Sequence, residues 1–370
     1  MKSKKINLTF FSNTRSEFGL INRLLESLKK YKKFSHKILL SGTHFSKQYG
    51  FTINEIKNNN VNYRKIFEYD TRKSTEKNII KNISFNTLKL SKIFEKIDYV
   101  VLFGDRIDLI PILTNCLVYN KKIIHFGGGE ETKGSIDNKI RKIISCSSNL
   151  HFVAAKKYKK NLIKFGIPKK NIFVVGTLSV EKKMKLKKDN FIYENINRKH
   201  LVSLTYHPTS IENISSGINQ IKIILGALEK FKNDIFVIIS APGFEKGSDK
   251  ILSFLEKWVK ERKNYKLYRS LGISKYTTLI KRSKFLIGNS SSGVIMAPFF
   301  NIPSINIGDR QKGRLVHNTV VNCELNKSKI IKEITKILNS KKKIKKVKFL
   351  LGNGDAAHKS AKILNNLLLN

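Results

Sequence analysis

Short apolar runs alternate with segments of helical periodicity along most of this chain. In its first half the apolar runs lie at residues 6–11, 38–40, 99–103, 123–124, 152–154 and 172–175. Helical spacing of apolar residues is clearest at residues 22–31 and 80–97. A strand followed by a helix, repeated, predicts a parallel sheet with helices on both faces. This pattern places the chain in the α/β class.

The alternation stops once, at residues 179–198, where Lys, Asn and Asp dominate. It then resumes, with strands expected at 201–206, 235–240, 285–287 and 304–307 and helices at 217–231, 250–260 and 274–281. A chain of 370 residues is long enough for two cores. We therefore predict two doubly wound domains, 1–178 and 199–354, joined by a hinge at 179–198, with a helix at 355–370 packing back on the first domain. Ligands of such folds bind at the carboxyl ends of the strands.

Composition sets limits on the partners and the compartment. The formal net charge is +45, but the lysines are spread over the whole length, and no aromatic platform or zinc-finger spacing accompanies their densest run at 341–348. We interpret that run as a solvated face or connector, with contact to an anionic surface as the alternative, and expect no specific nucleic-acid partner. Three scattered cysteines favour reduced thiols in a cytoplasmic protein. No apolar run approaches the length of a membrane span, and no histidine has the spacing of a metal site.

Two neighbouring loops in the second half predict a binding site for a diphosphate. The run at 285–287 breaks into Gly288-Asn289-Ser290-Ser291-Ser292-Gly293 before a helix-compatible segment, so backbone N–H groups and hydroxyls converge at a helix N-terminus. The strand at 304–307 runs into residues 308–314, where Arg310, Lys312 and Arg314 lie around two glycines. Each loop by itself has a plain alternative, a turn or a solvated face. Their adjacency favours an anion site.

Other strand ends carry candidate catalytic groups. Arg15 follows the first strand, although Thr14 or Ser16 could there simply cap a helix. Asp105 and Arg106 follow the strand at 99–103. Asp105 could be a helix cap or a member of an ion pair, or it could be a catalytic group at the end of the strand. The loop at 125–138 combines three glycines with Glu130, Glu131 and Asp137, and crowded carboxylates suit proton transfer. Glu131 by itself is expected to be a solvated side chain. His207 ends the strand at 201–206, where it is either structural or a phosphate ligand.

Together these loops resemble the UDP-N-acetylglucosamine 2-epimerase family, and within it the hydrolysing branch that feeds sialic and legionaminic acid synthesis. The resembling segments are NTRSEFGL (13–20), SGTHFSKQYGFT (41–52), GDR (104–106), HFGGGEETKGSIDNKIRK (125–142), YHPT (206–209), GNSSSGVIMAP (288–298) and GDRQKGR (308–314). They span nearly the whole chain. The resemblance implies the GT-B architecture, two Rossmann-like domains facing across a cleft.

The resemblance also implies an activity and roles for single residues. A UDP-linked 2-acetamido sugar would lose UDP through a 2-acetamidoglycal, and water would then release the free C2-inverted sugar. Asp105, Glu130 and Asp137 would transfer protons, with base and acid left open, and His207 would assist. The expected diphosphate ligands are Arg15, His207, Ser290, Ser291, Ser292, Gly293 and Arg314. The expected sugar contacts are His44, Arg106, His125, Gly128 and Gly129. We expect no cofactor or metal. We expect the protein to form a homodimer or a homotetramer.

The chain departs from the family pattern at several positions. Met296 stands where relatives carry a Glu that binds the ribose, and a thioether accepts hydrogen bonds poorly. Residues 240–247 lack the Asn and Asp of a family loop, and Gly127 and Asn13 are also unusual. These changes indicate an altered nucleotide, an altered sugar or reduced activity. A non-hydrolysing epimerase, a GT-B glycosyltransferase and a non-catalytic nucleotide-sugar-binding protein are the alternatives.

Overall fold

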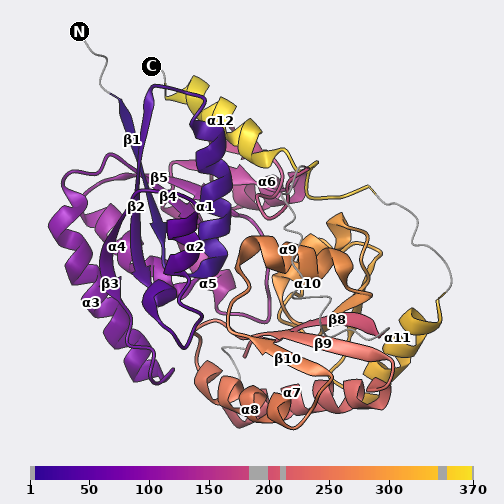
Figure 1. The fold of residues 1–370 in the computed structure, drawn as a ribbon. Helices are drawn as coiled ribbons and strands as arrows, with labels where there is room; N and C mark the ends of the chain where they lie inside the picture. Colours follow the sequence, from indigo (N-terminus) through magenta and orange to yellow (C-terminus); the bar gives the residue numbers. More distant parts are fainter. Residues whose placement is uncertain (1–4, 183–198, 209–213, 341–347, 369–370) are drawn as a thin grey trace.

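The computed structural model describes residues 5–182, 199–208, 214–340 and 348–368. Figure 1 shows two α/β units packed against each other, one built from the first half of the chain and one from the second. Most of the hinge predicted at 179–198 and the lysine run predicted at 341–348 lie outside the described residues.

The first half forms a seven-stranded sheet in which every pair of neighbouring strands is parallel, in the order β3-β2-β1-β4-β5-β6-β7. Its strands are β1 (Ile6–Ser12), β2 (Phe34–Gly42), β3 (Tyr63–Glu68), β4 (Tyr99–Phe103), β5 (Lys122–Phe126), β6 (Leu150–Val153) and β7 (Ile172–Val174). Its helices are α1 (Arg15–Leu28), α2 (Ile53–Asn58), α3 (Glu76–Phe94), α4 (Ile110–Val118), α5 (Asp137–Cys146) and α6 (Lys156–Lys164).

The second half forms a six-stranded, all-parallel sheet in the order β10-β9-β8-β11-β12-β13. Its strands are β8 (His200–Thr205), β9 (Ile235–Ser240), β10 (Tyr265–Tyr268), β11 (Phe285–Gly288), β12 (Ser304–Ile307) and β13 (Val320–Cys323). Its helices are α7 (Ile214–Leu228), α8 (Ser248–Lys260), α9 (Gly272–Arg282), α10 (Ser291–Phe299) and α11 (Lys327–Asn339). The α/β class expected from the alternation is confirmed.

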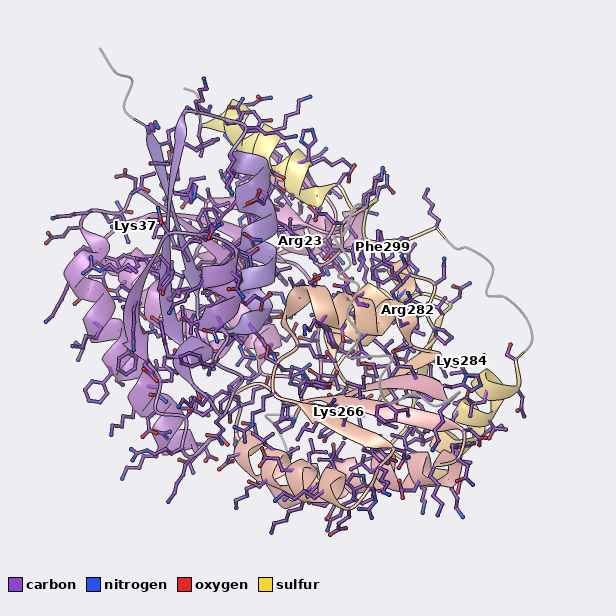
Figure 2. All side chains as sticks on the ribbon, in the orientation of Figure 1. Arg23, Lys37, Lys266, Arg282, Lys284 and Phe299 are labelled. Atoms are coloured by element: carbon purple, nitrogen blue, oxygen red, sulfur yellow. The ribbon has the colours of Figure 1, made fainter. Side chains whose placement is uncertain are left out.

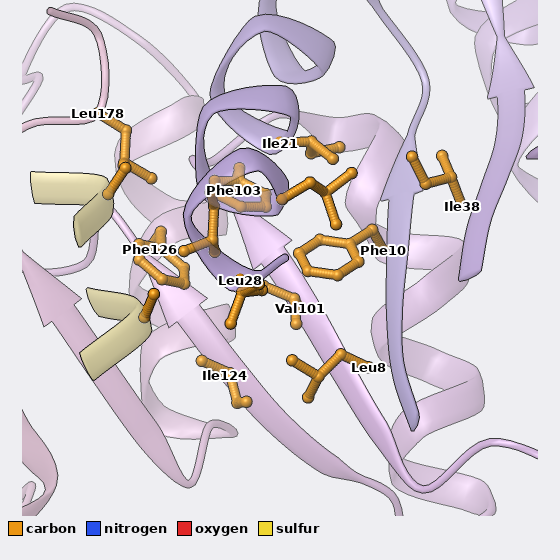
Figure 3. Close-up of a cluster of buried hydrophobic side chains, with 14 of the residues drawn as sticks. Leu8, Phe10, Ile21, Leu28, Ile38, Val101, Phe103, Ile124, Phe126 and Leu178 are labelled. Carbon is orange, nitrogen blue, oxygen red and sulfur yellow. The ribbon is translucent and has the colours of Figure 1, made fainter. Parts of the chain in front are cut away.

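The first sheet has a separate apolar core on each face, because successive side chains of a strand point to opposite sides. Phe10 packs with α1, α2 and the last helix, α12 (Ala356–Leu367), whereas Phe11 packs with α3, α4 and α5. Figure 3 shows the first of these cores, where Phe103 and Phe126 stack with ring centroids 4.9 Å apart. In Figure 1 the yellow α12 lies alongside the indigo α1, so the chain returns to its first half.

The prediction missed three strands, β3, β10 and β13, and each of them lies at the edge of its sheet. Their burial is broken or partial, since an edge strand has a neighbour on one side only. These three strands therefore lack the continuous apolar run by which the other strands were identified.

The charged side chains do not gather on one face. Figure 2 shows nitrogen-tipped side chains around the whole outline, with Lys37 on the first half and Lys266 and Lys284 on the second. This distribution agrees with a bias of the whole composition, which is how the sequence was interpreted. Among the described residues, no helix is both long and apolar enough to span a bilayer.

Candidate active site

A cavity of about 350 Å³ lies between the two halves. Loops that follow strands of both sheets line it, as expected for ligand sites of doubly wound folds. Ten of the residues expected at the site belong to this lining: Arg15, Asp105, Arg106, Glu130, Asp137, His207, Ser290, Ser291, Ser292 and Arg314. Segments up to 299 residues apart in the chain are thus brought to one place by the stacking of the two sheets.

Asp105 is held by a buried arginine that the sequence analysis did not single out. The Arg141 guanidinium on α5 donates to the Asp105 carboxylate and, over 2.8 Å, to the backbone oxygen of Glu130. Burial disfavours charge on Asp105, but Arg141 and then Arg314 outweigh it, so the pKa of Asp105 lies below its usual range. Asp105 is therefore ionised at neutral pH.

Asp137 has the opposite character, although it lines the same cavity. It begins α5, and an Arg310 guanidinium nitrogen lies 3.7 Å from its carboxylate. Burial, followed by repulsion from Asp105, raises the pKa of Asp137 to about 6. Two carboxyl groups with pKa values pushed apart in this way can divide the roles of base and acid. Glu130, the third carboxylate, pairs with Arg314 at 3.2 Å.

The predicted anion cradle is formed by the first turn of α10. Ser290 caps this helix by accepting from the Ser292 N–H at 3.4 Å, and the Ser292 hydroxyl is 2.7 Å from the Tyr276 hydroxyl. Gly288 before the turn has φ of +131°, and a Cβ there would come within 2.0 Å of the Thr205 oxygen. Glycine is thus required for the sharp exit from β11, which aims the helix N-terminus at the cavity.

Asn289 ties three loops of the second half together at this cradle. Its side chain accepts from the His207 N–H and donates to the His207 oxygen, both at 2.7 Å. Its backbone oxygen accepts from Gln311 at 2.9 Å and from Arg310 at 3.3 Å. Burial, followed by the charge of Arg310, lowers the pKa of His207 to about 3, so its imidazole is neutral.

Several buried polar atoms at the cavity have no hydrogen-bond partner among the described residues. They include His207 Nδ1, Gln311 Oε1 and Arg314 Nε. Buried polar groups are nearly always satisfied in folded proteins, so such a cluster marks a place where a ligand completes the bonding. Arg314 Nε is a donor and suits an anion, whereas Gln311 Oε1 can only accept.

Arg15 connects the two halves beside the cradle. It begins α1, and its guanidinium donates to the backbone oxygens of Ala241, at 2.6 Å, and Arg269. Burial lowers the pKa of Arg15 from its usual value, and the side chain lines the cavity. An anion in the cradle would therefore meet cations from both halves.

Five residues expected at the site lie outside the cavity lining. His44 shares hydrogen bonds of 2.8 Å with Ser12 and Thr52. His125 donates to the Gly104 oxygen at 2.8 Å. Burial lowers the pKa of His44 to about 3 and that of His125 to about 4. Both rings are neutral and satisfied inside the first half, so direct sugar contacts find no support in their positions.

The three glycines of this group are required for close packing. A Cβ at Gly128 would lie 2.9 Å from Ser145 Oγ, and one at Gly129 would lie 2.3 Å from the Tyr158 oxygen. A Cβ at Gly293 would lie 2.7 Å from Ser304 Oγ, which is where α10 packs on β12. Gly127, in contrast, does line the cavity.

Sequence reasoning gave no role to other lining residues, among them Glu245, Tyr276 and Gln311, and it named Arg310 only as one of the cations of its loop. Arg310 and Gln311 stood in the loop that was singled out for its cations, and Glu245 stood in the segment that departs from the family pattern. Met296 also lines the cavity, but it packs among Val180, Ile280 and Leu286. The wall that α10 presents to the ligand is therefore apolar at this point. Among the described residues, no group of three or more His, Cys, Asp or Glu is placed to hold a metal ion.

Comparisons with known proteins agree with this geometry. A family model described as UDP-N-acetylglucosamine 2-epimerase matches residues 26–365. The chain is 34% identical over 346 residues to the GDP/UDP-N,N'-diacetylbacillosamine 2-epimerase (hydrolyzing) of Campylobacter jejuni, covering 88% of this chain and 86% of the relative. It is 27% identical over 369 residues to the UDP-N,N'-diacetylbacillosamine 2-epimerase (hydrolyzing) of Legionella pneumophila, covering 98% and 96%.

Solved structures share the fold. The S. aureus MnaA-UDP co-structure superposes with a TM-score of 0.80 at 16% identity, covering 99% of this chain and 98% of that one. At this identity the likeness shows the fold alone.

Proposed function

The chain belongs to the UDP-N-acetylglucosamine 2-epimerase family, and from this premise we propose that it is a hydrolysing nucleotide-sugar 2-epimerase. It would release a free, C2-inverted 2-acetamido sugar and a nucleoside diphosphate. The observation that carries the proposal is the meeting of Asp105, Glu130 and Asp137 with the α10 cradle in one cavity. Two relatives whose names include the word hydrolyzing support the same branch.

We assign the first step to Asp105. Its lowered pKa keeps the carboxylate ionised, as a base must be. The carboxylate takes the proton from C2, the C–H electron pair forms the C1=C2 bond, and the C1–O bond breaks with its pair leaving on the diphosphate. The cations around the cradle balance the charge that develops on that leaving group.

We assign the return of a proton to Asp137. A group with a pKa near 6 still holds a proton in a useful fraction of molecules near neutral pH. In the second step the oxygen of a water molecule bonds to C1, its proton passes to a carboxylate of the site, and Asp137 delivers a proton to the opposite face of C2. Inversion at C2 requires the two carboxyl groups to reach opposite faces of the sugar, and they come from different elements, the loop after β4 and the start of α5.

The substrate follows from the relatives and from the cavity wall. Both named relatives act on N,N'-diacetylbacillosamine nucleotides, so we propose a UDP- or GDP-linked 2,4-diacetamido-2,4,6-trideoxyhexose, with UDP-N-acetylglucosamine as the alternative. Met296 supplies no carboxylate to the ribose, so the nucleotide is held mainly through its diphosphate, by Arg15, His207, Ser290–Ser292 and Arg314.

Proton NMR in D₂O tests this proposal. Purified protein is incubated with each nucleotide sugar, and free sugar, free nucleotide and deuterium at C2 are followed. We expect a C2-inverted free sugar that carries deuterium at C2, together with nucleoside diphosphate. Reversible formation of a second nucleotide sugar would indicate a non-hydrolysing epimerase, and nucleotide binding without any product would indicate a non-catalytic relative.

The Asp105→Asn variant tests the base. We expect it to lose nucleotide release by about 10²- to 10⁴-fold, the usual contribution of a general base. Its thermal unfolding should remain cooperative, because an asparagine oxygen can still accept from Arg141. Full activity in a folded Asp105→Asn variant would remove the assignment.

We further propose that the protein is a cytoplasmic homo-oligomer. Large apolar side chains are exposed on the adjacent helices α3 and α4: Ile80, Phe85, Leu88, Leu117 and Val118. Two copies can cover such a face by pairing about a two-fold axis. Light scattering of the wild type should give a multiple of the 42.5 kDa chain mass. We expect the Leu88→Lys variant to give a lower mass, and the control variant Ile163→Lys, at an exposed position on α6, to give the wild-type mass. A wild-type mass of one chain would contradict this proposal.

A further inference from the structure

The carboxylate of Glu245 lies where cations from both halves converge. Its Oε1 atom is 3.0 Å from Arg106 in the first half, and 3.6 Å from His207 Nδ1 and 3.9 Å from Arg310 in the second. It shares this cavity with Ser290–Ser292. A negative group at the meeting point of these side chains is what a bound phosphate would otherwise provide.

The backbone around Glu245 is anchored to the first half, so the position of the carboxylate is not that of a loose loop. Phe244 packs edge-on against Tyr49 with ring centroids 5.5 Å apart, and its backbone oxygen accepts from Arg106 at 3.0 Å. On the other side, the Ser248 and Tyr49 hydroxyls are 2.9 Å apart, and the Gly247 N–H donates to the Ser74 oxygen at 3.2 Å. Accommodation of a ligand therefore falls to the Glu245 side chain.

Charge makes simultaneous occupancy unfavourable. Burial disfavours charge on Glu245, but the charges of Arg310 and Arg106 outweigh it and lower the pKa of Glu245, so this carboxylate is ionised at neutral pH. A diphosphate that reached Arg310 or His207 would lie within a few ångströms of it. Two like charges at such a distance repel strongly in a partly buried site.

We propose that Glu245 is an internal counter-ion that occupies the diphosphate position of the empty enzyme, weakens nucleotide binding and speeds the departure of the nucleotide product. The inference rests on the proposed function, because it requires a diphosphate ligand in this cavity. When the substrate binds, its phosphates replace the carboxylate at Arg310 and His207, and the side chain turns away. After turnover the carboxylate returns and competes with the product for the same side chains.

Calorimetric binding to the full-length protein tests this inference. Glu245→Gln keeps the size and shape of the side chain and removes its charge. We expect it to bind UDP, GDP and inorganic pyrophosphate about tenfold more tightly than wild type, because the repulsion is relieved. The dissociation of UDP, followed by stopped flow, should slow correspondingly. Uridine, which carries no phosphate, should bind equally to both proteins.

Two further variants keep the test decisive. Glu261→Gln removes a carboxylate of the same half that is 74% exposed and pairs with Arg262 outside the cavity, and we expect wild-type affinity. Glu245→Asp keeps the charge but withdraws it by one methylene group, so we expect a smaller gain in affinity for pyrophosphate than in Glu245→Gln. This variant also provides the test if Glu245→Gln does not fold. Unchanged or weaker pyrophosphate binding by the folded Glu245 variants would overturn the inference. The proposed function would still stand in that case if the wild-type protein turned over its substrate. Failure of wild type to bind any diphosphate would overturn both.

Discussion

Side chains of one residue type differ in pKa here because their neighbours differ. Asp105 faces Arg141 and Arg314, which lower its pKa, whereas Asp137 is buried beside Asp105, which raises its pKa to about 6. Nothing in the local sequence distinguishes the two. Arg141 comes four residues after Asp137 on α5, yet its partner Asp105 lies on another loop. The sequence could therefore nominate the carboxylates but not divide the roles between them.

The pH dependence of catalysis should report Asp137. As the acid it must hold its proton, and a carboxyl group with pKa about 6 loses that proton as the pH rises through 6. We expect kcat/KM to fall above about pH 6, and Asp137→Asn to lower the rate by about 10²- to 10⁴-fold and to remove this limb. Asp309→Asn, which alters a 76% exposed carboxylate of a nearby loop, should keep the limb. A limb that persists in Asp137→Asn belongs to another group.

At the scale of elements, the start of α1 shows why helix boundaries were harder to predict than helices. Apolar periodicity placed the helix at 22–31, but it begins at Arg15, because Thr14 and Glu17 form a capping box. The Glu17 carboxylate accepts from the N–H groups of Asn13 and Thr14. This polar first turn places Arg15 at the cavity. It could not be detected from apolar periodicity because it has no apolar stripe.

Glu17 makes the stability of this cap depend on pH. Burial raises its pKa from 4.5 to about 8, so the folded chain keeps the proton that the unfolded chain releases near 4.5. The contribution of Glu17 to stability is therefore full below pH 4.5 and is lost as the pH rises to about 8. Glu17→Gln keeps an acceptor for the cap and cannot titrate. In urea unfolding we expect it to gain stability relative to wild type between pH 5 and pH 8.5, and an equal difference at both pH values would contradict this account.

At the scale of the whole molecule, the last helix completes the core of the first half. Ala357, Ala361 and Leu364 of α12 are buried in the same cluster as Phe10 and Leu28. Because α12 follows the second sheet in sequence, unfolding of the first half must also release the end of the chain. The two halves are thus joined at a further place besides the cavity.

A matched pair of leucines on α12 measures this connection. Leu364 is fully buried, and its replacement by alanine should lower the free energy of unfolding by about 2–5 kcal/mol, as for other buried leucines. Leu367 is 41% exposed, and Leu367→Ala should cost less than about 1 kcal/mol. Denaturant unfolding of both variants distinguishes the cases, and equal losses would mean that α12 is only loosely attached.

Local pattern was sufficient to establish the α/β class, the central strands and the loops after β4, β5, β11 and β12, because apolar runs, glycines and clustered polar residues are visible in a short window. Tertiary structure alone decided which loops meet. It brought Asp105 to Arg141 and Glu245 to Arg106, and it turned His44 and His125 into satisfied core residues. Burial and the distance between charges depend on contacts between segments remote in the chain, so the ionisation states from which the mechanism was argued arise only in the folded chain.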